Sequence, residues 1–176
     1  VYDAESLRTL AGKKYHKKKN HVNAFLKEYE GRYEYRALTP ADKGTIWQFL
    51  NRWENGKSDD VGQHLEGEIV GIHELLNNLD KINAKIAGVF IDGQLEAFTV
   101  GSYNPTDRMA VIHIEKANAD IRGLYTFINQ QFLVHEFADA VLVNREDDVG
   151  MEALRKAKQS YHPIMMVRKF SMQQKR

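Results

Sequence analysis

The chain has 176 residues, a formal net charge of +1 at pH 7 and no cysteine, which excludes disulfides, cysteine-based zinc sites and thiol nucleophiles. Hydrophobic residues make up 43% and charged residues 28% of the chain, a balance typical of one globular domain without an overall field that draws it to nucleic acid or membrane. No signal peptide is visible, and no apolar run approaches the roughly 18 residues of a membrane-spanning helix. We therefore expect a cytoplasmic domain with no transmembrane segment, whose basic surface is local.

The first predicted elements are a basic helix and a strand. Residues 4–30 carry apolar side chains at interrupted helical spacing, and Gly31 is expected to end this helix. Residues 33–38 then alternate between apolar and polar side chains, as in a strand. We therefore expect residues 1–31 to form a basic helical entry segment, and residues 32–176 to form the main domain.

Two more helices are predicted next. The Thr-Pro-Ala-Asp segment at 39–42 is typical of a helix start, because the threonine can cap the helix and the aspartate can reach back to it. We expect this helix to end at Asn55-Gly56, and a second one to run from about Asp60 to Leu79.

Three strands should follow these helices. The apolar runs 87–91 and 95–100 are separated by Asp92-Gly93, which is a strong hairpin signal because both central residues of a type I′ turn need positive φ. Residues 109–115 form the third strand of this group. The change from helical to alternating spacing places an antiparallel sheet in the middle of the chain.

The last third of the chain predicts alternating helices and strands. Asp120 can cap a helix over 121–137, residues 140–144 form a short buried strand, and Asp148 can cap a final helix that ends near residues 161–163. Residues 164–170 are expected to close the sheet as its last strand. The element order from residue 33 is β-α-α-β-β-β-α-β-α-β, which resembles the GNAT-type acyl-CoA N-acyltransferase fold: an α/β (α+β) domain with a mixed sheet flanked by helices.

In that fold the helix starting near residue 121 faces the pyrophosphate of acyl-CoA, since free N–H groups at a helix start attract phosphate. Acyl-CoA users place Gln or Arg, then Gly three positions later, then Gly or Ala five positions later. Here these positions hold Asp120, Gly123 and Tyr125. The acidic and bulky residues argue against acetyl-CoA, so we expect no cofactor; Arg122 and Gly123 remain candidates for substrate contacts, with Tyr125.

The strand over 109–115 carries two candidate catalytic residues. Alternation puts Val111, His113 and Glu115 on one face, where a carboxylate or imidazole could deprotonate an attacking group. The alternatives are a solvated face or a hydrogen-bonded interior histidine. We expect Glu115 and His113 to act on the proton.

A second candidate region is a lysine run. Five lysines fall within residues 13–19 and form the one concentrated positive patch of the sequence, which could contact phosphates of RNA or of anionic lipid. A solvated helix face is the alternative. The residues are Lys13, Lys14, Lys17, Lys18 and Lys19.

A third candidate region is the polar loop after the strand over 140–144. Asn144 and Arg145 are expected to contact ligand, Glu146 could bind a cationic amine, and Lys158 could hold phosphate or carboxylate. Asp148 is expected to act as a helix cap. The sequence has no P-loop, no HExxH, no GxSxG and no recognisable Ser/His/Asp set.

Three segments together resemble the phosphatidylglycerol lysyltransferase C-terminal domain family: residues 10–23, 120–132 and 144–163. The resemblance implies a tandem pair of GNAT-like domains, of which this chain is the second and Val1-Tyr2-Asp3 the tail of the first. It also implies aminoacyl transfer from aminoacyl-tRNA to a lipid or peptide acceptor. Two other functions stay open, namely an acetyl-CoA-dependent N-acetyltransferase and a non-catalytic half that binds RNA or anionic phospholipid head groups.

Overall fold

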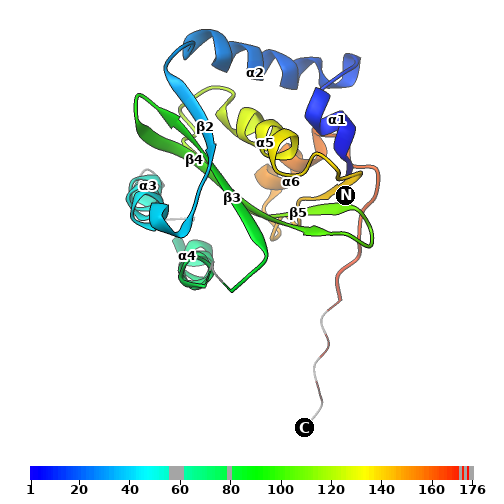
Figure 1. Cartoon of the computed structure of the whole chain (residues 1–176). Helices are drawn as coiled ribbons and strands as arrows, with labels where there is room; N and C mark the ends of the chain where they lie inside the picture. Colours follow the sequence, from blue (N-terminus) through cyan, green and yellow to red (C-terminus); the bar gives the residue numbers. More distant parts are fainter. Residues whose placement is uncertain (56–61, 79–80, 171, 173, 175–176) are drawn as a thin grey trace.

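The computed structural model describes residues 1–55, 62–78, 81–170, 172 and 174. A six-stranded mixed sheet runs through the centre of the molecule in the order β1-β6-β5-β4-β3-β2, in which only the β5–β6 pair is parallel within the described chain (Figure 1). The strands are β1 (Tyr2–Asp3), β2 (Tyr33–Ala37), β3 (Ala84–Ile91), β4 (Gln94–Asn104), β5 (Met109–Ala117) and β6 (Leu142–Asn144). The expected mixed sheet is therefore confirmed.

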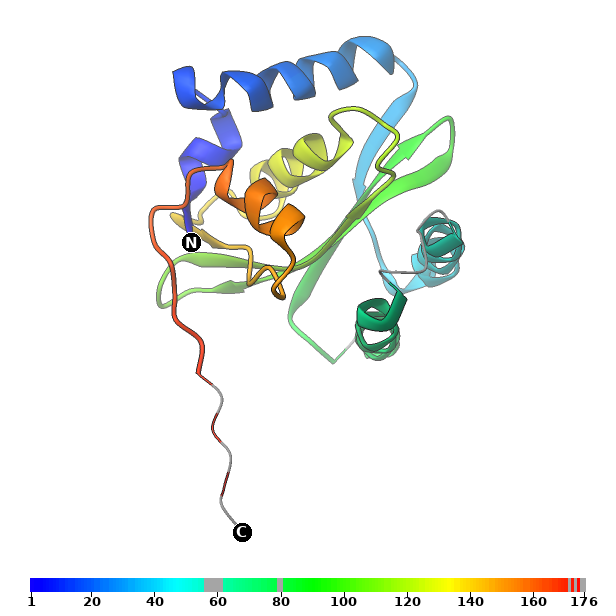
Figure 2. The same ribbon diagram turned by 180° about the vertical axis from the view of Figure 1, so that it is seen from behind.

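Helices cover both faces of the sheet (Figures 1 and 2). The side we call the α5 face carries α1 (Ala4–Thr9), α2 (His16–Glu28), α5 (Leu124–His135) and α6 (Glu152–Gln159). The opposite side, the α4 face, carries α3 (Lys43–Asn55) and α4 (Gly62–Asn77). Each face has its own cluster of buried apolar side chains, with Phe127 and Phe132 in the first and Phe49 and Phe98 in the second.

Local turn chemistry behaves as the sequence predicts. Asp92 and Gly93 both have positive φ, at 50° and 83°, and join β3 to β4. Thr39 and Asp42 form a capping box around the short 3₁₀ helix Pro40–Asp42 that precedes α3. The expected helix end at Gly56 and the expected helix start at Asp60 lie outside the described residues.

The prediction of one helix over residues 4–30 is wrong. The chain leaves the helical conformation at Leu10, whose φ of 49° is left-handed, and at Gly12, whose φ is 87°. The result is α1, the 3₁₀ helix Lys13–Tyr15 and α2. Leu7, Tyr15 and Phe25 from these helices are buried in the same cluster as α5, so the N-terminal segment packs directly on the main sheet.

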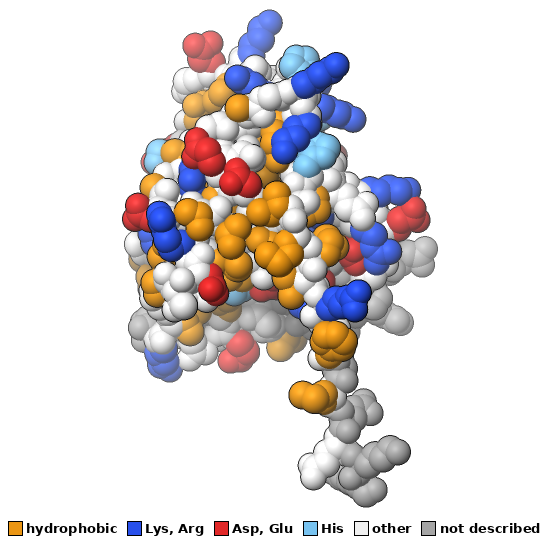
Figure 3. All heavy atoms as spheres, turned by 90° about the vertical axis from the view of Figure 1, so that its right-hand side faces the viewer, with side chains coloured by type: hydrophobic (Ala, Val, Ile, Leu, Met, Phe, Trp, Pro, Cys, Tyr) orange, Lys and Arg blue, Asp and Glu red, His pale blue; other side chains and the backbone are white. Residues whose placement is uncertain are grey.

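The predicted strand over 164–170 is also absent. β1 occupies the sheet edge beside β6, so no β6 edge remains for the C-terminal segment to extend. Instead, the N–H groups of Ile164 and Met165 donate to the carbonyl oxygen of Val1, at 2.9 and 3.3 Å. The apolar side chains beyond this point, including Met166, are exposed along the outside of the molecule (Figure 3).

Two predicted helix caps are wrong. Asp120 does not cap α5, which starts later, after Gly123 with its φ of 88°. The carboxylate of Asp148 binds Arg155 at 2.6 and 3.0 Å, and the residue that precedes α6 is Met151. In both cases an intervening residue with positive φ, Gly123 or Gly150, ends the loop one turn later than the acidic residue suggests. Among the described residues, no helix is long and apolar enough to cross a membrane.

Candidate functional site

A β-bulge in β5 decides how the site is arranged. Val100 of β4 pairs with Ile114, and Gly101 pairs with Ile112, so His113 is an extra residue without a partner in the register. As a result Ile112 lies in the core of the α5 face and Ile114 in the core of the α4 face.

The bulge overturns the expectation that His113 and Glu115 share a face. His113 lines a cleft beside α4, whereas Glu115 is hydrogen-bonded to Asn129 of α5 on the other side of the sheet. The alternation from Val111 to Glu115 looks regular in the sequence, and an extra strand residue leaves no compositional signal. The two candidate catalytic residues therefore belong to two different environments.

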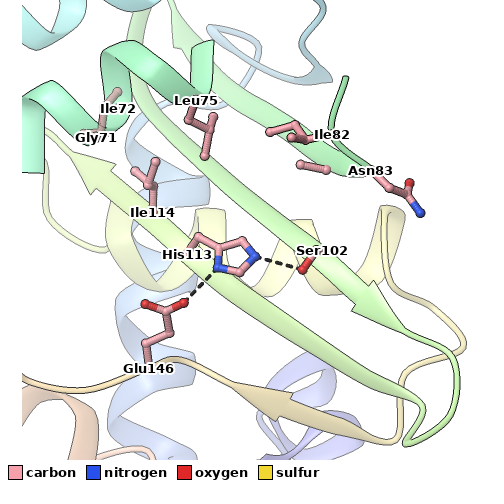
Figure 4. A pocket seen from close by; sticks show the side chains of 10 residues that line it. Gly71, Ile72, Leu75, Ile82, Asn83, Ser102, His113, Ile114 and Glu146 are labelled. Carbon is pink, nitrogen blue, oxygen red and sulfur yellow. Dashed lines mark hydrogen bonds and ion pairs between the residues drawn. The ribbon is translucent and has the colours of Figure 1, made fainter. Parts of the chain in front are cut away.

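His113 is held between two side chains at the wall of the cleft (Figure 4). Its Nδ1 lies 2.8 Å from Oε1 of Glu146, and its Nε2 lies 2.8 Å from Oγ of Ser102. The side chains of His113 and Glu146 are 34% and 41% exposed, so a substrate can reach them. A carboxylate that accepts from the Nδ1 proton fixes the tautomer and makes Nε2, which lies next to Ser102, the proton acceptor.

The cleft has a volume of about 540 Å³ and a mostly apolar lining. α4 contributes Ile72 and Leu75, the segment before β3 contributes Ile82, and β5 contributes Ile114 (Figure 4). An apolar cavity with a few convergent polar groups is the usual form of a small-molecule site. The sequence shows no ordered Ser/His/Asp set, but the fold brings Ser102 of β4, His113 of β5 and Glu146 of the loop after β6 together.

The loop after β6 is shaped to place Glu146. Its backbone N–H donates to Oδ1 of Asn144 at 2.9 Å, and Glu146 adopts a left-handed φ of 53° that is uncommon for a residue with a side chain. Asn144, which we expect from the sequence to contact ligand, makes this turn bond with its side-chain oxygen. Backbone strain of this kind persists only where surrounding contacts hold it, and it often occurs at functional sites.

On the α5 face, Arg145 and Glu115 form a buried ion pair. Nη2 of Arg145 lies 2.8 Å from Oε1 of Glu115, and their side chains are only 10% and 11% exposed. Nδ2 of Asn129 donates to the other carboxylate oxygen at 2.7 Å. The register between β5 and β6 ends at Val111 and Asn144, so this pair ties the two strands together just where they diverge.

Further cations and aromatic rings surround this ion pair. Lys18 lies with its Nζ 3.8 Å from the centre of the Tyr161 ring, and the Arg145 guanidinium carbon lies 4.6 Å from the same ring. Lys158 donates to the carbonyl oxygen of Arg145 at 2.6 Å. Burial, reinforced by the positive charge of Arg145, lowers the pKa of Lys158 and lowers the pKa of Lys18 to about 8. Arg145 pairs with the Glu115 carboxylate, whose negative charge also acts on Lys18 and Lys158.

α2 contacts the residue that precedes α5. A Cβ atom on Gly123 would lie 2.1 Å from the carbonyl oxygen of His21, so this glycine allows the two helices to touch. Arg122 is exposed beside this contact, and Tyr125 is 36% exposed on the first turn of α5. The carbonyl oxygen of His21 therefore lies against the glycine that precedes α5, at the helix start expected to face phosphate.

The lysine run divides into exposed and half-buried members. Lys13, Lys14, Lys17 and Lys19 are exposed, whereas Lys18 turns inward to Tyr161. Basic side chains gather over α2 at the top of Figure 3. The structure therefore places four of the five predicted lysines where a large anionic partner can reach them.

Sequence reasoning missed Ser102, Asn129 and Tyr161 as parts of these arrangements. Ser102 and Asn129 are polar residues beside apolar runs, which is a signal for a specific contact but names no partner. Tyr161 follows α6 and donates its hydroxyl to Oγ1 of Thr126 at 3.1 Å, a contact far apart in the sequence. No cluster of three or more histidine or acidic side chains with metal-binding geometry occurs in the part of the chain that the structure describes.

Comparison with known proteins gives a family and a fold. Residues 1–173 match the model of the family described as phosphatidylglycerol lysyltransferase, C-terminal. An uncharacterized protein of Mycoplasmoides gallisepticum is 26% identical over 97% of this chain and 54% of its own length. The crystal structure of a conserved protein of unknown function from Bacteroides thetaiotaomicron is 32% identical, with a TM-score of 0.87 over 94% of this chain and 55% of its own.

A possible acetyltransferase from Clostridium difficile superposes with a TM-score of 0.53 at 13% identity, over 82% of this chain and 99% of its own. This likeness concerns the fold alone, and it confirms the expected GNAT-like architecture. The chain spans about half the length of the first two relatives, 54% and 55%.

Proposed function

We propose that this chain, which belongs to the phosphatidylglycerol lysyltransferase C-terminal family, transfers an aminoacyl group from an aminoacyl-tRNA to an acceptor bound in the His113 cleft. The acceptor is a lipid or peptide, and an anionic phospholipid head group fits the family description. Because the relatives are about twice as long, we further propose that a GNAT-like domain of the same protein precedes this one and completes the reaction.

The observation that carries the proposal is the position of His113. It lies at the wall of an open cleft with Glu146 on Nδ1, so its Nε2 can take the proton of an acceptor hydroxyl or amine. The acceptor then attacks the carbonyl carbon of the aminoacyl ester, and the released tRNA 3′-oxygen receives a proton. An aminoacyl ester is already activated, so orientation and one base supply much of what the step needs.

The donor side of the proposal rests on the exposed lysines. Lys13, Lys14, Lys17 and Lys19 lie near the start of α2 and can neutralise phosphates of a tRNA or of a lipid surface. Arg122, exposed at the start of α5, extends this basic region. Such contacts carry affinity without base specificity, which suits a partner recognised mainly through its backbone.

The same geometry disfavours acetyl-CoA as the donor. In GNAT enzymes the pyrophosphate approaches the helix start that here holds Gly123, and the carbonyl of His21 occupies the space next to it. Asp120 and Tyr125 add a negative charge and bulk at the same end of α5.

The test combines binding with turnover. We expect bulk aminoacyl-tRNA to raise the melting temperature in a salt-sensitive way and acetyl-CoA to leave it unchanged. With labelled aminoacyl-tRNA and phosphatidylglycerol vesicles, His113→Asn and Glu146→Gln should lower transfer by about 100-fold or more.

A matched control is His135→Asn, since His135 is an exposed histidine on α5, on the other side of the sheet. It should keep the wild-type rate. Saturable stabilisation by acetyl-CoA would instead support an N-acetyltransferase, and tRNA or vesicle binding without any turnover would support a binding role alone.

A further inference from the structure

Ser102, His113 and Glu146 form a continuous hydrogen-bonded row along one wall of the cleft (Figure 4). We propose that Ser102 is a nucleophile that takes the acyl group from the donor ester and carries it as a covalent ester on its Oγ before the acceptor arrives. The inference rests on the proposed function only in taking the donor to be an activated carboxylic ester.

The geometry is that of an activated serine. Oγ of Ser102 lies 2.8 Å from Nε2 of His113, and Oε1 of Glu146 lies 2.8 Å from Nδ1. When the carboxylate accepts the Nδ1 proton in a hydrogen bond, Nε2 becomes the acceptor for the serine hydroxyl. Nucleophile, base and orienting acid are thus arranged in the order that covalent acyl transfer requires.

Each member of the row is held by the backbone. Ser102 pairs with Val111 in the ladder between β4 and β5, one step from the bulge that turns His113 toward the α4 face. Glu146 is fixed by its left-handed φ and by the turn bond to Asn144. Because the backbone bulge positions His113 and the backbone turn positions Glu146, the row is determined by the backbone and not only by side-chain rotamers.

The surroundings indicate the class of acyl group. Ile72, Leu75 and Ile82 face the row across the cleft, and their side chains offer an apolar wall with no charge (Figure 4). An acyl chain that is apolar, or an aminoacyl group with an apolar side chain, would gain from burial there.

The proposed step balances as follows. The Oγ–H proton of Ser102 passes to Nε2 of His113 as Oγ bonds to the ester carbonyl carbon. The bond from that carbon to the alcohol oxygen of the donor breaks, and the departing oxygen takes the proton from Nε2. The acceptor, or water, then repeats the sequence on the seryl ester and regenerates the free hydroxyl.

The experiment uses the whole chain with p-nitrophenyl esters of short apolar acids. Rapid mixing should give a burst of p-nitrophenolate that matches the enzyme concentration, and mass spectrometry should find one acyl group on the peptide that contains Ser102. Ser102→Ala should abolish burst and adduct, and His113→Asn should slow the burst about 100-fold or more.

Ser160→Ala is the control, because the exposed Ser160 donates its hydroxyl to the carbonyl oxygen of Ala157 at the end of α6, and the variant should leave burst and adduct unchanged. Absence of an adduct in the wild type, or an adduct that persists in Ser102→Ala, would overturn the inference. The two proposals can fail separately. Full aminoacyl transfer by Ser102→Ala would refute the serine nucleophile and keep His113 as base, whereas an adduct on Ser102 without aminoacyl transfer would refute the tRNA-dependent function alone.

Discussion

Arg145 and Glu146 are consecutive residues, yet their side chains bind opposite faces of β5. Arg145 meets Glu115 on the α5 face, and Glu146 meets His113 on the α4 face. This is possible because the pairing of β6 with β5 ends at Asn144, and the next two residues turn to opposite faces of β5. The bulge at His113 then turns the two partners on β5 in opposite directions.

The buried ion pair should contribute strongly to stability. Arg145→Met leaves the Glu115 carboxylate 11% exposed with Asn129 as its remaining hydrogen-bond partner among the described residues, which we expect to cost about 3–5 kcal/mol of unfolding free energy. Urea denaturation measures this loss. Arg155→Met is the control, because the solvent-screened Arg155–Asp148 pair should contribute little to stability.

Glu115→Gln separates a structural role from a catalytic one. A structural carboxylate predicts a loss of stability with little change in turnover per folded molecule, since Glu115 lies on the face away from the cleft. A fall in turnover at unchanged stability would show instead that Glu115 acts on the reacting proton. Parallel measurement of denaturation and of aminoacyl transfer distinguishes the two results.

The contact between α2 and α5 depends on Gly123. Gly123→Ala places a Cβ 2.1 Å from the His21 carbonyl oxygen at a position with φ of 88°, so we expect a loss of about 2 kcal/mol or more. Gly31→Ala is the matched variant, because Gly31 also has a positive φ, at 72°, but an added Cβ would have no neighbour within 4 Å. We expect it to lower the unfolding free energy by about 1 kcal/mol. Equal losses for the two variants would show that backbone strain, and not helix contact, sets the cost.

Lys18 should make stability depend on pH above neutrality. Burial holds its folded pKa at about 8, below its ordinary value of 10.5, so between these values the unfolded chain binds more protons and stability rises with pH. The free-energy cost of burying the charged Lys18 side chain is complete below pH 8 and falls as the pH rises from about 8 towards 10.5. Lys18→Met should therefore be more stable than the wild type by about 1 kcal/mol near pH 7, a value reduced for solvent screening at this half-exposed site. Near pH 9.5 its advantage in stability should be smaller.

Urea denaturation of both proteins at the two pH values measures this difference. An equal difference in unfolding free energy between Lys18→Met and the wild type at both pH values would contradict a lowered pKa for Lys18.

The exposed lysines should carry binding without carrying stability. Replacing Lys17 and Lys19 by Ala should weaken binding to tRNA or anionic vesicles and reduce the slope of log affinity against log salt by about 2. Melting temperature should stay the same, since both side chains are exposed. Lys27→Ala, farther along α2 and also exposed, is the control for general charge, and an equal effect there would show that the lysine run is not a specific contact.

The sequence predicts most elements because their signals are local. The Asp92-Gly93 hairpin and the capping box of Thr39 and Asp42 each depend on residues a few positions apart, and both are confirmed. The break at Leu10 could not be foreseen in the same way, since a left-handed leucine follows from tertiary packing and not from local preference.

Contacts between residues far apart in the sequence account for the remaining differences between the predicted and the observed structure. The strand expected at 164–170 has suitable residues, but β1 holds the place beside β6. The candidate site was predicted in part. His113 and Glu146 were identified from their residue types, but their contact across 33 positions of the sequence was not predicted. Ser102 was missed, since only the register between β4 and β5 brings it to His113.

The bulge at His113 has a consequence for how this domain can change. With regular alternation, His113 and Glu115 would lie on one face of the sheet, and substitutions in the cleft would also act on the ion pair between Glu115 and Arg145. With the two separated by the sheet, substitutions in the cleft and at the ion pair should be nearly additive. Substitutions can then change the lining of the cleft on one side of the sheet without weakening the ion pair on the other side.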